Sequence, residues 1–272
     1  ILTLQQAAPL LPAGFNFDGI TAIAYEPDSG YADGSAVTNG FAKAARRAGG
    51  EVRLGAEATA LLTDGGRVTG VATADGPIHA DRVVLCAGPW ATQFLMSVGA
   101  PLPLSYIRHQ VIQLHRPLDR FPTLPTVADV TGGYSFRPDS GDTTLVTIKE
   151  DPDDRDTYNR GVDADVAAEA VEQMARRIPG FEEAGWDGGW SGIFTITPDW
   201  HPIIDAVPGV DGLVVGAGFS GHGFKLSPAI GRALAELSLH GESRAIDVRD
   251  LRFTRFAEGD LMESAYGATV FA

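Results

Sequence analysis

Near the carboxyl end of the chain, a glycine-rich turn joins a hydrophobic run to a helical pattern. The run Leu213–Gly216 reads as a buried strand, Gly216-Ala217-Gly218-Phe219-Ser220-Gly221 forms the turn, and helical spacing extends from about Gly223 to Leu239. A strand that turns directly into a helix is typical of an α/β layer, in which helices pack on a sheet. Because a helix start presents unpaired amide groups and partial positive charge, the sequence predicts a place for an electron-rich group beside this turn.

The turn also matches G-x-G-x-x-G, the pattern of a dinucleotide-binding loop. Its position, about fifty residues from the end of the chain, leaves little room for the rest of a mononucleotide-binding half. The ribose-binding acid expected about 20 residues later on a second strand would be Glu236, which falls inside the helix. A nicotinamide-binding protein, and a close turn that binds nothing, remain alternatives to a site for another electron-rich ligand.

The first hundred residues contain further elements of the same layer. Helical spacing follows Asp33 or Ser35, either of which can cap a helix, and ends at Gly49-Gly50. Two strand patterns, Ala58–Thr63 and Val68–Ala74, flank the turn Asp64-Gly65-Gly66, which predicts a β-hairpin. A buried strand is expected at Arg82–Cys86.

From about Pro101 the pattern changes to alternating strands. Residues 106–116, Tyr134–Arg137 and Thr144–Ile148 alternate as in an antiparallel sheet with one exposed face, and Asp163–Ile178 is an amphipathic helix. We therefore expect a mixed α/β (α+β) fold. Residues 1–100 and 190–272 would form one discontinuous domain, and residues 101–189 an antiparallel-sheet domain that contributes the substrate pocket.

Composition excludes several classes of function. The formal net charge of −14 argues against nucleic acid or an anionic membrane as a partner, and no apolar run is long enough to span a bilayer. Cys86 is the only cysteine, and the six histidines lack the spacing of a zinc site. We expect a cytoplasmic protein without a metal site, in which Cys86 is an inert thiol of the core.

Several landmarks together resemble the D-amino-acid-oxidase superfamily, most closely its branch of monomeric sarcosine and fructosyl-amino-acid oxidases. The similar segments are Thr197-Pro198-Asp199-Trp200-His201-Pro202, the run from Gly212 to Lys225, Gly30-Tyr31-Ala32-Asp33, Val83–Trp90 and the ending Asp250–Phe256. The resemblance implies a Rossmann-like FAD/NAD(P)-binding layer and an FAD cofactor. It also implies that a first βαβ unit, with its own glycine-rich turn, should precede Ile1. We expect a missing amino-terminal segment or a second chain to supply that unit.

The resemblance also assigns roles to individual residues. Lys225 would pair with the substrate carboxylate, while His222 and Tyr134 would lie near the flavin or the substrate; a structural histidine and an ordinary cross-strand aromatic remain the alternatives. The FAD contacts would come from Ala58, Ala87, Gly88, Gly192, Gly218, Phe219, Ser220, Gly221, Gly223 and Lys225.

Two positions depart from the family pattern. Gly192 stands where some members attach the flavin through a cysteine, so the FAD is expected to be non-covalent. Val146 stands where several members place a lysine that activates oxygen, which puts the electron acceptor in doubt.

The resemblance implies oxidation of the C–N bond of a secondary amine or amino acid to an imine. The alternative is a non-catalytic fragment, or one subunit of a split flavoenzyme that needs a partner chain to bind FAD.

Overall fold

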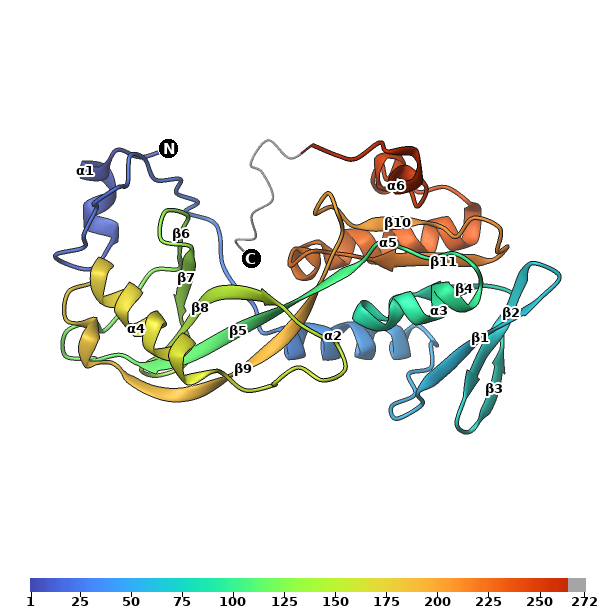
Figure 1. The fold of residues 1–272 in the computed structure, drawn as a ribbon, viewed down its shortest axis with the longest axis horizontal. Coiled ribbons are helices and arrows are strands. Elements are labelled where there is room, and N and C mark those ends of the chain that lie inside the picture. Colours follow the sequence, from blue (N-terminus) through green and yellow to red (C-terminus); the bar gives the residue numbers. More distant parts are fainter. Residues whose placement is uncertain (264–272) are drawn as a thin grey trace. The chain divides into compact units, whose positions relative to one another are not determined.

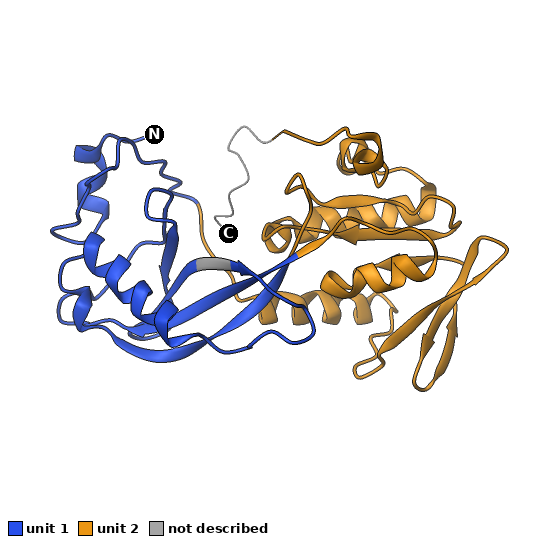
Figure 2. Cartoon of the chain, viewed as in Figure 1, with its two compact units in different colours: residues 1–28, 106–194, 271 blue, residues 29–105, 195–270, 272 orange. Residues whose placement is uncertain are grey.

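The computed structural model describes residues 1–263, apart from the side chains of residues 149 and 150. Its elements are both helices and strands, which confirms the predicted mixed α/β class (Figure 1). The chain divides into two compact units (Figure 2). Unit 1 contains residues 1–28 and 106–194, and unit 2 contains residues 29–105 and the described residues from 195 onward. The chain therefore passes from unit 1 into unit 2, back into unit 1, and again into unit 2.

Unit 1 is built on a five-stranded sheet in the order β6-β7-β8-β5-β9. Antiparallel pairing joins β6 to β7, β7 to β8 and β8 to β5. The elements are α1 (Leu4–Ala7), β5 (Ser105–His115), β6 (Val127–Asp129), β7 (Tyr134–Pro138), β8 (Thr143–Pro152), α4 (Ala164–Arg177) and β9 (Gly185–Ile196). The antiparallel sheet and its long helix were both predicted from the alternation and the helical spacing.

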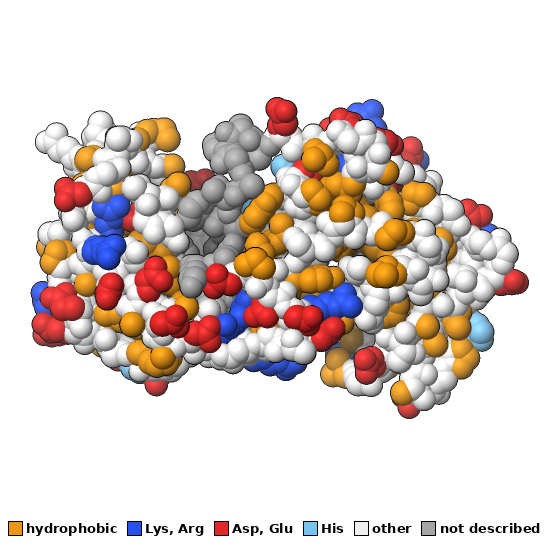
Figure 3. Space-filling view, viewed as in Figure 1, with side chains coloured by type: hydrophobic (Ala, Val, Ile, Leu, Met, Phe, Trp, Pro, Cys, Tyr) orange, Lys and Arg blue, Asp and Glu red, His pale blue; other side chains and the backbone are white. Residues whose placement is uncertain are grey.

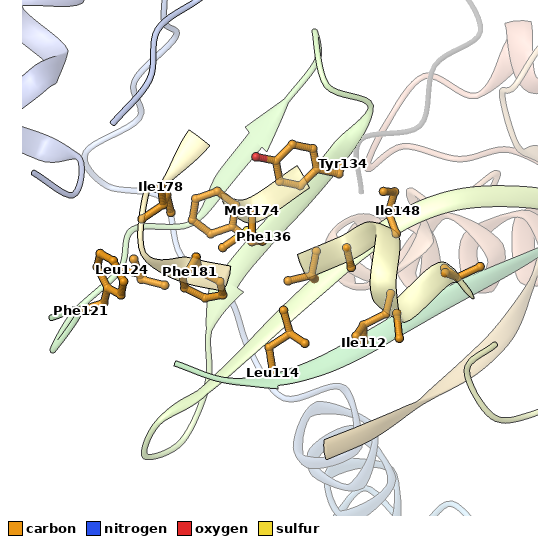
Figure 4. Packing of buried hydrophobic residues seen from close by; sticks show 14 of the residues in the cluster. Ile112, Leu114, Phe121, Leu124, Tyr134, Phe136, Ile148, Met174, Ile178 and Phe181 are labelled. Atoms are coloured by element: carbon orange, nitrogen blue, oxygen red, sulfur yellow. The ribbon is translucent and has the colours of Figure 1, made fainter. Parts of the chain in front are cut away.

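Helix α4 covers one face of this sheet and closes the core of unit 1. Val166, Ala170 and Met174 recur every four residues and are almost fully buried. They pack with alternate residues of the strands, among them Ile112 and Phe136 (Figure 4). Since residues four apart share one face of a helix, this pattern fixes which side of α4 meets the sheet.

The amino-terminal segment belongs to unit 1, which corrects the predicted boundary that placed it with the other domain. Phe15 is buried in the core beneath α4. Arg177, at the end of α4, donates hydrogen bonds to the carbonyls of Asn16 (3.1 Å) and Asp18 (2.6 Å) and forms a buried ion pair with Asp129 (2.7 Å). Long-range contacts of this kind leave no local signal in the sequence.

Unit 2 contains two three-stranded sheets and four helices among the described residues. One sheet is the antiparallel β1-β2-β3, and in the other β11 lies between antiparallel β10 and parallel β4. The elements are α2 (Gly34–Arg47), β1 (Ala58–Asp64), β2 (Arg67–Thr73), β3 (Gly76–His79), β4 (Val83–Leu85), α3 (Ala91–Ser97), β10 (Ile203–Ala206), β11 (Leu213–Ala217), α5 (Gly223–His240) and α6 (Arg255–Glu258). The predicted hairpin is confirmed as β1 and β2.

Strand β11 is the centre of unit 2. Each of its five residues is buried. Leu213 and Val215 pack into the cluster that contains α3, whereas Val214 faces the opposite cluster with Ile230 and Leu234 of α5. The strand is therefore covered on both faces, as its unbroken apolar run predicts for a parallel strand.

Helix α2 forms where the sequence predicts it but buries none of its residues. Asp33 caps its start by accepting a hydrogen bond from the Ala36 amide (2.5 Å), and Gly49 follows its end with a positive φ of 90°. Phe41, in the middle of the apolar face, is 50% exposed. Within the described residues the apolar face of this amphipathic helix is uncovered.

One contact of unit 1 predicts a dependence of stability on pH. His115 places Nδ1 3.0 Å from Asp142 and Nε2 3.0 Å from Asp187. The hydrogen bond with Asp142, and then the nearby negative charges, raise the pKa of His115 above its ordinary value. A raised pKa stabilises the fold fully below the unfolded value of about 6.5, and this stability is lost as the pH rises through the folded value.

His115 should therefore contribute a fall in the melting temperature as the pH rises from about 6 to about 9, and His115→Gln should remove that contribution from the slope of the wild type. The control is His79→Gln, which changes an exposed histidine of β3 and should keep the wild-type slope. Equal slopes in all three proteins, measured by differential scanning calorimetry, would contradict the prediction.

Candidate functional site

The parallel pairing of β4 and β11 brings two separate loops together at the carboxyl-terminal ends of these strands. Val83 pairs with Leu213 and Leu85 with Val215, so β4 ends beside Val215 and β11 continues two residues further, to Ala217. The residues that follow β4 are Cys86, Ala87 and Gly88, and the residues that follow β11 form the glycine-rich turn and the start of α5. Ligands of open α/β sheets bind outside the carboxyl ends of such strands. This edge is the candidate site.

The structure thus gathers most of the predicted cofactor residues within unit 2. Those at the shared edge are Ala87, Gly88, Gly218, Phe219, Ser220, Gly221, Gly223 and Lys225. Gly88 has a positive φ of 52°, and a side chain added there would meet no atom within 4 Å. The backbone is therefore open to a neighbour at the end of β4.

The glycines of the turn are required by the protein's own packing. Gly218 has a φ of 67°, and a Cβ atom there would lie 2.3 Å from the side chain of Thr197. At Gly216 a Cβ atom would lie 2.9 Å from Leu234. A bulky residue at Gly218 would therefore disrupt the turn itself, whether or not the turn binds a ligand.

Ser220 is buried and holds the turn from inside. It has a φ of 48°, which is rare for a residue with a side chain. Its amide donates to the carbonyl of Thr195 (3.0 Å) and its hydroxyl donates to the carbonyl of Gly218 (3.2 Å). Ser220, predicted to bind cofactor, therefore already uses its amide and its hydroxyl within the protein.

Helix α5 begins at this turn without a side-chain cap. His222 occupies the capping position but makes no capping hydrogen bond. The first amide groups of an α-helix have no partner within the helix, and their dipoles favour a negative charge. An uncapped start at the end of a parallel strand is suited to an anionic or electron-rich group.

Lys225 lies exposed in the first turn of α5. Its ammonium group makes no hydrogen bond or ion pair with any residue between 1 and 263. The flanking Phe224 and Leu226 are also exposed, at 49% and 42%. A cation at a helix start opposes the helix dipole. Lys225 is therefore placed to bind an anion, and packing does not account for it.

His222 is kept neutral beside this lysine. Partial burial lowers the pKa of His222, and the positive charge of Lys225 lowers it further. A neutral imidazole can accept or donate a hydrogen bond at neutral pH without adding charge to the site.

The remaining predicted residues lie elsewhere. Ala58 begins β1 in the other sheet of unit 2 and is exposed. Gly192 lies in β9 of unit 1, half-buried, with open space around its Cα. A cysteine would therefore fit at this position, and its absence is not forced by packing.

Tyr134 and Val146 both face α4 in the core of unit 1. Tyr134 is 2% exposed, its hydroxyl donates to the carbonyl of Gln173 (3.2 Å), and burial raises its pKa. Val146 is fully buried on the adjacent strand. The structure thus favours the cross-strand packing role for Tyr134, and a lysine at residue 146 would bury a charge under α4.

The side chain of Cys86 is exposed, so the expectation that this thiol lies in the core is wrong. The cause is the position of β4 at the edge of its sheet, where Val84 is also 39% exposed. Alternate side chains of an edge strand face outward unless another layer covers them.

A buried ion pair supports the glycine-rich turn and was not foreseen. Arg255 is fully buried and binds both carboxylate oxygens of Asp199, at 2.7 and 3.0 Å, as well as the carbonyl of His201. Although burial opposes ionisation, these hydrogen bonds lower the pKa of Asp199 to about 2. Thr197 donates to the same His201 carbonyl (2.8 Å) and packs on Gly218. Asp199 and Arg255 each lie in a segment that was singled out in the sequence, but no sequence pattern indicates that the two side chains form a pair.

Two other kinds of site are absent from residues 1–263. No group of three or more His, Cys, Asp or Glu side chains is arranged to hold a metal ion. No described helix combines the length and the apolar character needed to cross a bilayer.

Comparison with known proteins gives a consistent set of relatives. A family model described as "DAO: FAD dependent oxidoreductase" matches residues 1–237. Glycine oxidase of Pseudomonas putida is 32% identical over 193 residues, covering 70% of this chain and 50% of that protein. Sarcosine oxidase subunit beta of Rhodobacter capsulatus is 26% identical over 268 residues, covering 98% of this chain and 63% of that protein.

Among solved structures, L-proline dehydrogenase from P. horikoshii superposes with a TM-score of 0.85 at 26% identity, covering 96% of this chain and 69% of that chain. The chain spans between 27% and 63% of the length of eight curated relatives that it matches.

The buried pair of Asp199 and Arg255 predicts a large loss of stability when one partner is removed. Arg255→Leu should lower the free energy of unfolding by about 3 to 5 kcal/mol, because it leaves a carboxylate buried and unpaired. Urea denaturation followed by circular dichroism measures the change. Arg249→Leu, which removes an exposed arginine, should leave the midpoint nearly unchanged. Similar midpoints for the two variants would show that the pair does not hold the turn.

Proposed function

Since the chain belongs to the DAO family of FAD-dependent oxidoreductases, we propose that the protein oxidises the C–N bond of a secondary amine or amino acid. This family assignment confirms the resemblance seen in the sequence, and with it FAD as the cofactor. Glycine oxidase and sarcosine oxidase subunit beta are among the relatives, and their names fit this substrate class.

The observation that carries the proposal is the unpaired Lys225 at the uncapped start of α5. Its ammonium group would bind the carboxylate of an amino-acid substrate. With the carboxylate held at one point, the amine-bearing carbon has a restricted set of positions. Charge-assisted hydrogen bonds of this kind are stronger than those between neutral groups.

The residues at the candidate site are chemically compatible with FAD. The open backbone at Gly88, the uncapped helix start at Gly223 and His222, whose pKa is lowered by partial burial and by Lys225, can contact a flavin nucleotide without a charge conflict. FAD accepts the hydride when bound, and the protein contributes binding, orientation and electrostatics. The positive end of α5 would favour negative charge that develops on a bound group. With glycine at residue 192, a thioether to the flavin at that position is excluded.

The alternative is that this chain works only with another polypeptide segment or a second chain. Strand β4 has no partner on its outer edge among residues 1–263, and Val84 and Cys86 beside that edge are exposed. Helix α2 also leaves Phe41 uncovered. Figure 3 shows hydrophobic side chains gathered over one face of unit 2. A strand paired with β4 and a layer over this surface would complete the sheet and its nucleotide-binding edge.

Replacement of Lys225 tests the role of its charge. In the intact, flavin-loaded enzyme, Lys225→Met should raise KM about 10- to 100-fold for amines that carry a carboxylate, since about 1.5 to 3 kcal/mol of charge-assisted binding is lost. Amines without a carboxylate should be oxidised as before. Lys225→Arg should recover part of the loss, and Arg232→Met, on an exposed position of the same helix, serves as the control. Equal losses for both substrate types would rule out Lys225 as the anchor.

Binding of FAD separates the proposal from its alternative. We expect the 272-residue chain by itself to bind FAD weakly and to bind it more tightly when a polypeptide that pairs with β4 is present. Flavin fluorescence, together with the intact mass of the yellow species, measures both. Tight, stoichiometric binding to a species of 28.7 kDa would contradict the need for a partner.

A further inference from the structure

A cavity of about 460 Å³ lies in unit 2 at the ends of β11 and α5 that are remote from the glycine-rich turn. Its wall includes Asp211 and Leu213, where β11 begins, and Leu237 and His240, where α5 ends. The turn with Lys225 is at the other end of both elements. The cavity is therefore separate from the candidate site for flavin and substrate.

Two arginines, Arg67 and Arg82, line this cavity. Both are exposed, and the guanidinium group of neither makes a hydrogen bond or ion pair with a residue of the described part of the chain. Many other surface arginines are paired with acids, such as Arg53 with Glu51 and Arg244 with Glu242. Arg67 and Arg82 instead bring two unpaired guanidinium groups to one cavity of a chain with a net charge of −14.

The backbone around these arginines is held by hydrogen bonds from both sides. Arg67 forms a parallel bridge with Asp211, and the amide of Val68 donates to the Asp211 carbonyl (2.9 Å). On the other side the amide of Val83 donates to the Gly212 carbonyl (2.9 Å). Arg67 and Arg82 therefore project from fixed positions on either side of the Asp211–Gly212 segment.

We infer that this cavity binds a small phosphate monoester. A phosphoryl group has three acceptor oxygens and about two negative charges, so it can engage two guanidinium groups at once. A lone carboxylate matches a single guanidinium, so two guanidinium groups in one cavity favour a phosphoryl group. The apolar side chains of Val207, Val210 and Leu237 provide a hydrophobic surface for the organic part of the ligand. The inference does not depend on the proposed oxidase activity.

Three ligands test this chemistry: phenyl phosphate, benzoate, which carries a carboxylate on the same ring, and inorganic phosphate, which lacks the ring. Isothermal titration calorimetry on the full chain should show saturable binding of phenyl phosphate, weaker binding of inorganic phosphate and the weakest binding of benzoate. Arg67→Gln and Arg82→Gln should each weaken phenyl phosphate binding by about tenfold or more. Both changes are at exposed positions, so the melting temperature of the free protein should stay at the wild-type value.

Two controls locate the site. Arg47→Gln removes an exposed arginine of α2 outside the cavity and should leave the affinity unchanged. Lys225→Met should also leave it unchanged, which separates this cavity from the glycine-rich turn. Absence of saturable binding, affinities in Arg67→Gln and Arg82→Gln equal to wild type, or loss of binding in Lys225→Met would each overturn the inference. Benzoate binding as tight as phenyl phosphate binding would overturn the assignment to phosphate monoesters.

Discussion

The ion pair between Asp199 and Arg255 is the contact on which the candidate site rests. It joins the segment before β10 to the short helix α6, and both side chains are withdrawn from solvent. The pair fixes a turn in which Trp200 has a φ of 61°, and that turn holds Thr197 against Gly218. Removing two charges from water is costly, so such a pair is kept where geometry matters more than stability. Here the geometry is that of the loop from which α5 begins.

The glycine-rich turn shows how a sequence motif and its usual ligand can be separated. Gly218 and Gly216 are glycines because Thr197 and Leu234 leave no room for a side chain. The motif therefore describes a tight strand-to-helix junction, and pyrophosphate binding does not follow from it. Three unusual features of this junction bear on function. The helix start has no cap, a lysine opposes the helix dipole, and the adjacent histidine is held neutral.

The sequence predicted those parts of the fold that depend on local signals. The cap at Asp33 and the glycines at 49 and 50 bounded α2, and the turn at 64–66 located the hairpin. It could not predict that Arg177 would tie residues 16 and 18 to unit 1, since that contact joins distant parts of the chain. Burial of Cys86 was misjudged for a related reason. An apolar run shows that a strand suits a core, but whether another layer covers each face of the strand depends on the tertiary packing. Of the site, the sequence could locate Lys225 and the turn, whereas the Asp199–Arg255 pair and the placement of Tyr134 needed the structure.

In this chain, the charged side chains without a partner indicate binding sites better than the paired ones do. Acids outnumber bases, 35 to 21, so an exposed cation can readily find a carboxylate, and many of the arginines do. Exposed pairs of this kind contribute little to stability, and their loss would cost little. Some cations nevertheless have no acidic partner in the described part of the chain. Lys225 lies in the first turn of α5, and Arg67 and Arg82 flank the Asp211–Gly212 segment, whose backbone is fixed by hydrogen bonds on both sides. Positive charge is therefore present near both ends of β11 and α5, and at each end it is available to an anion from solution.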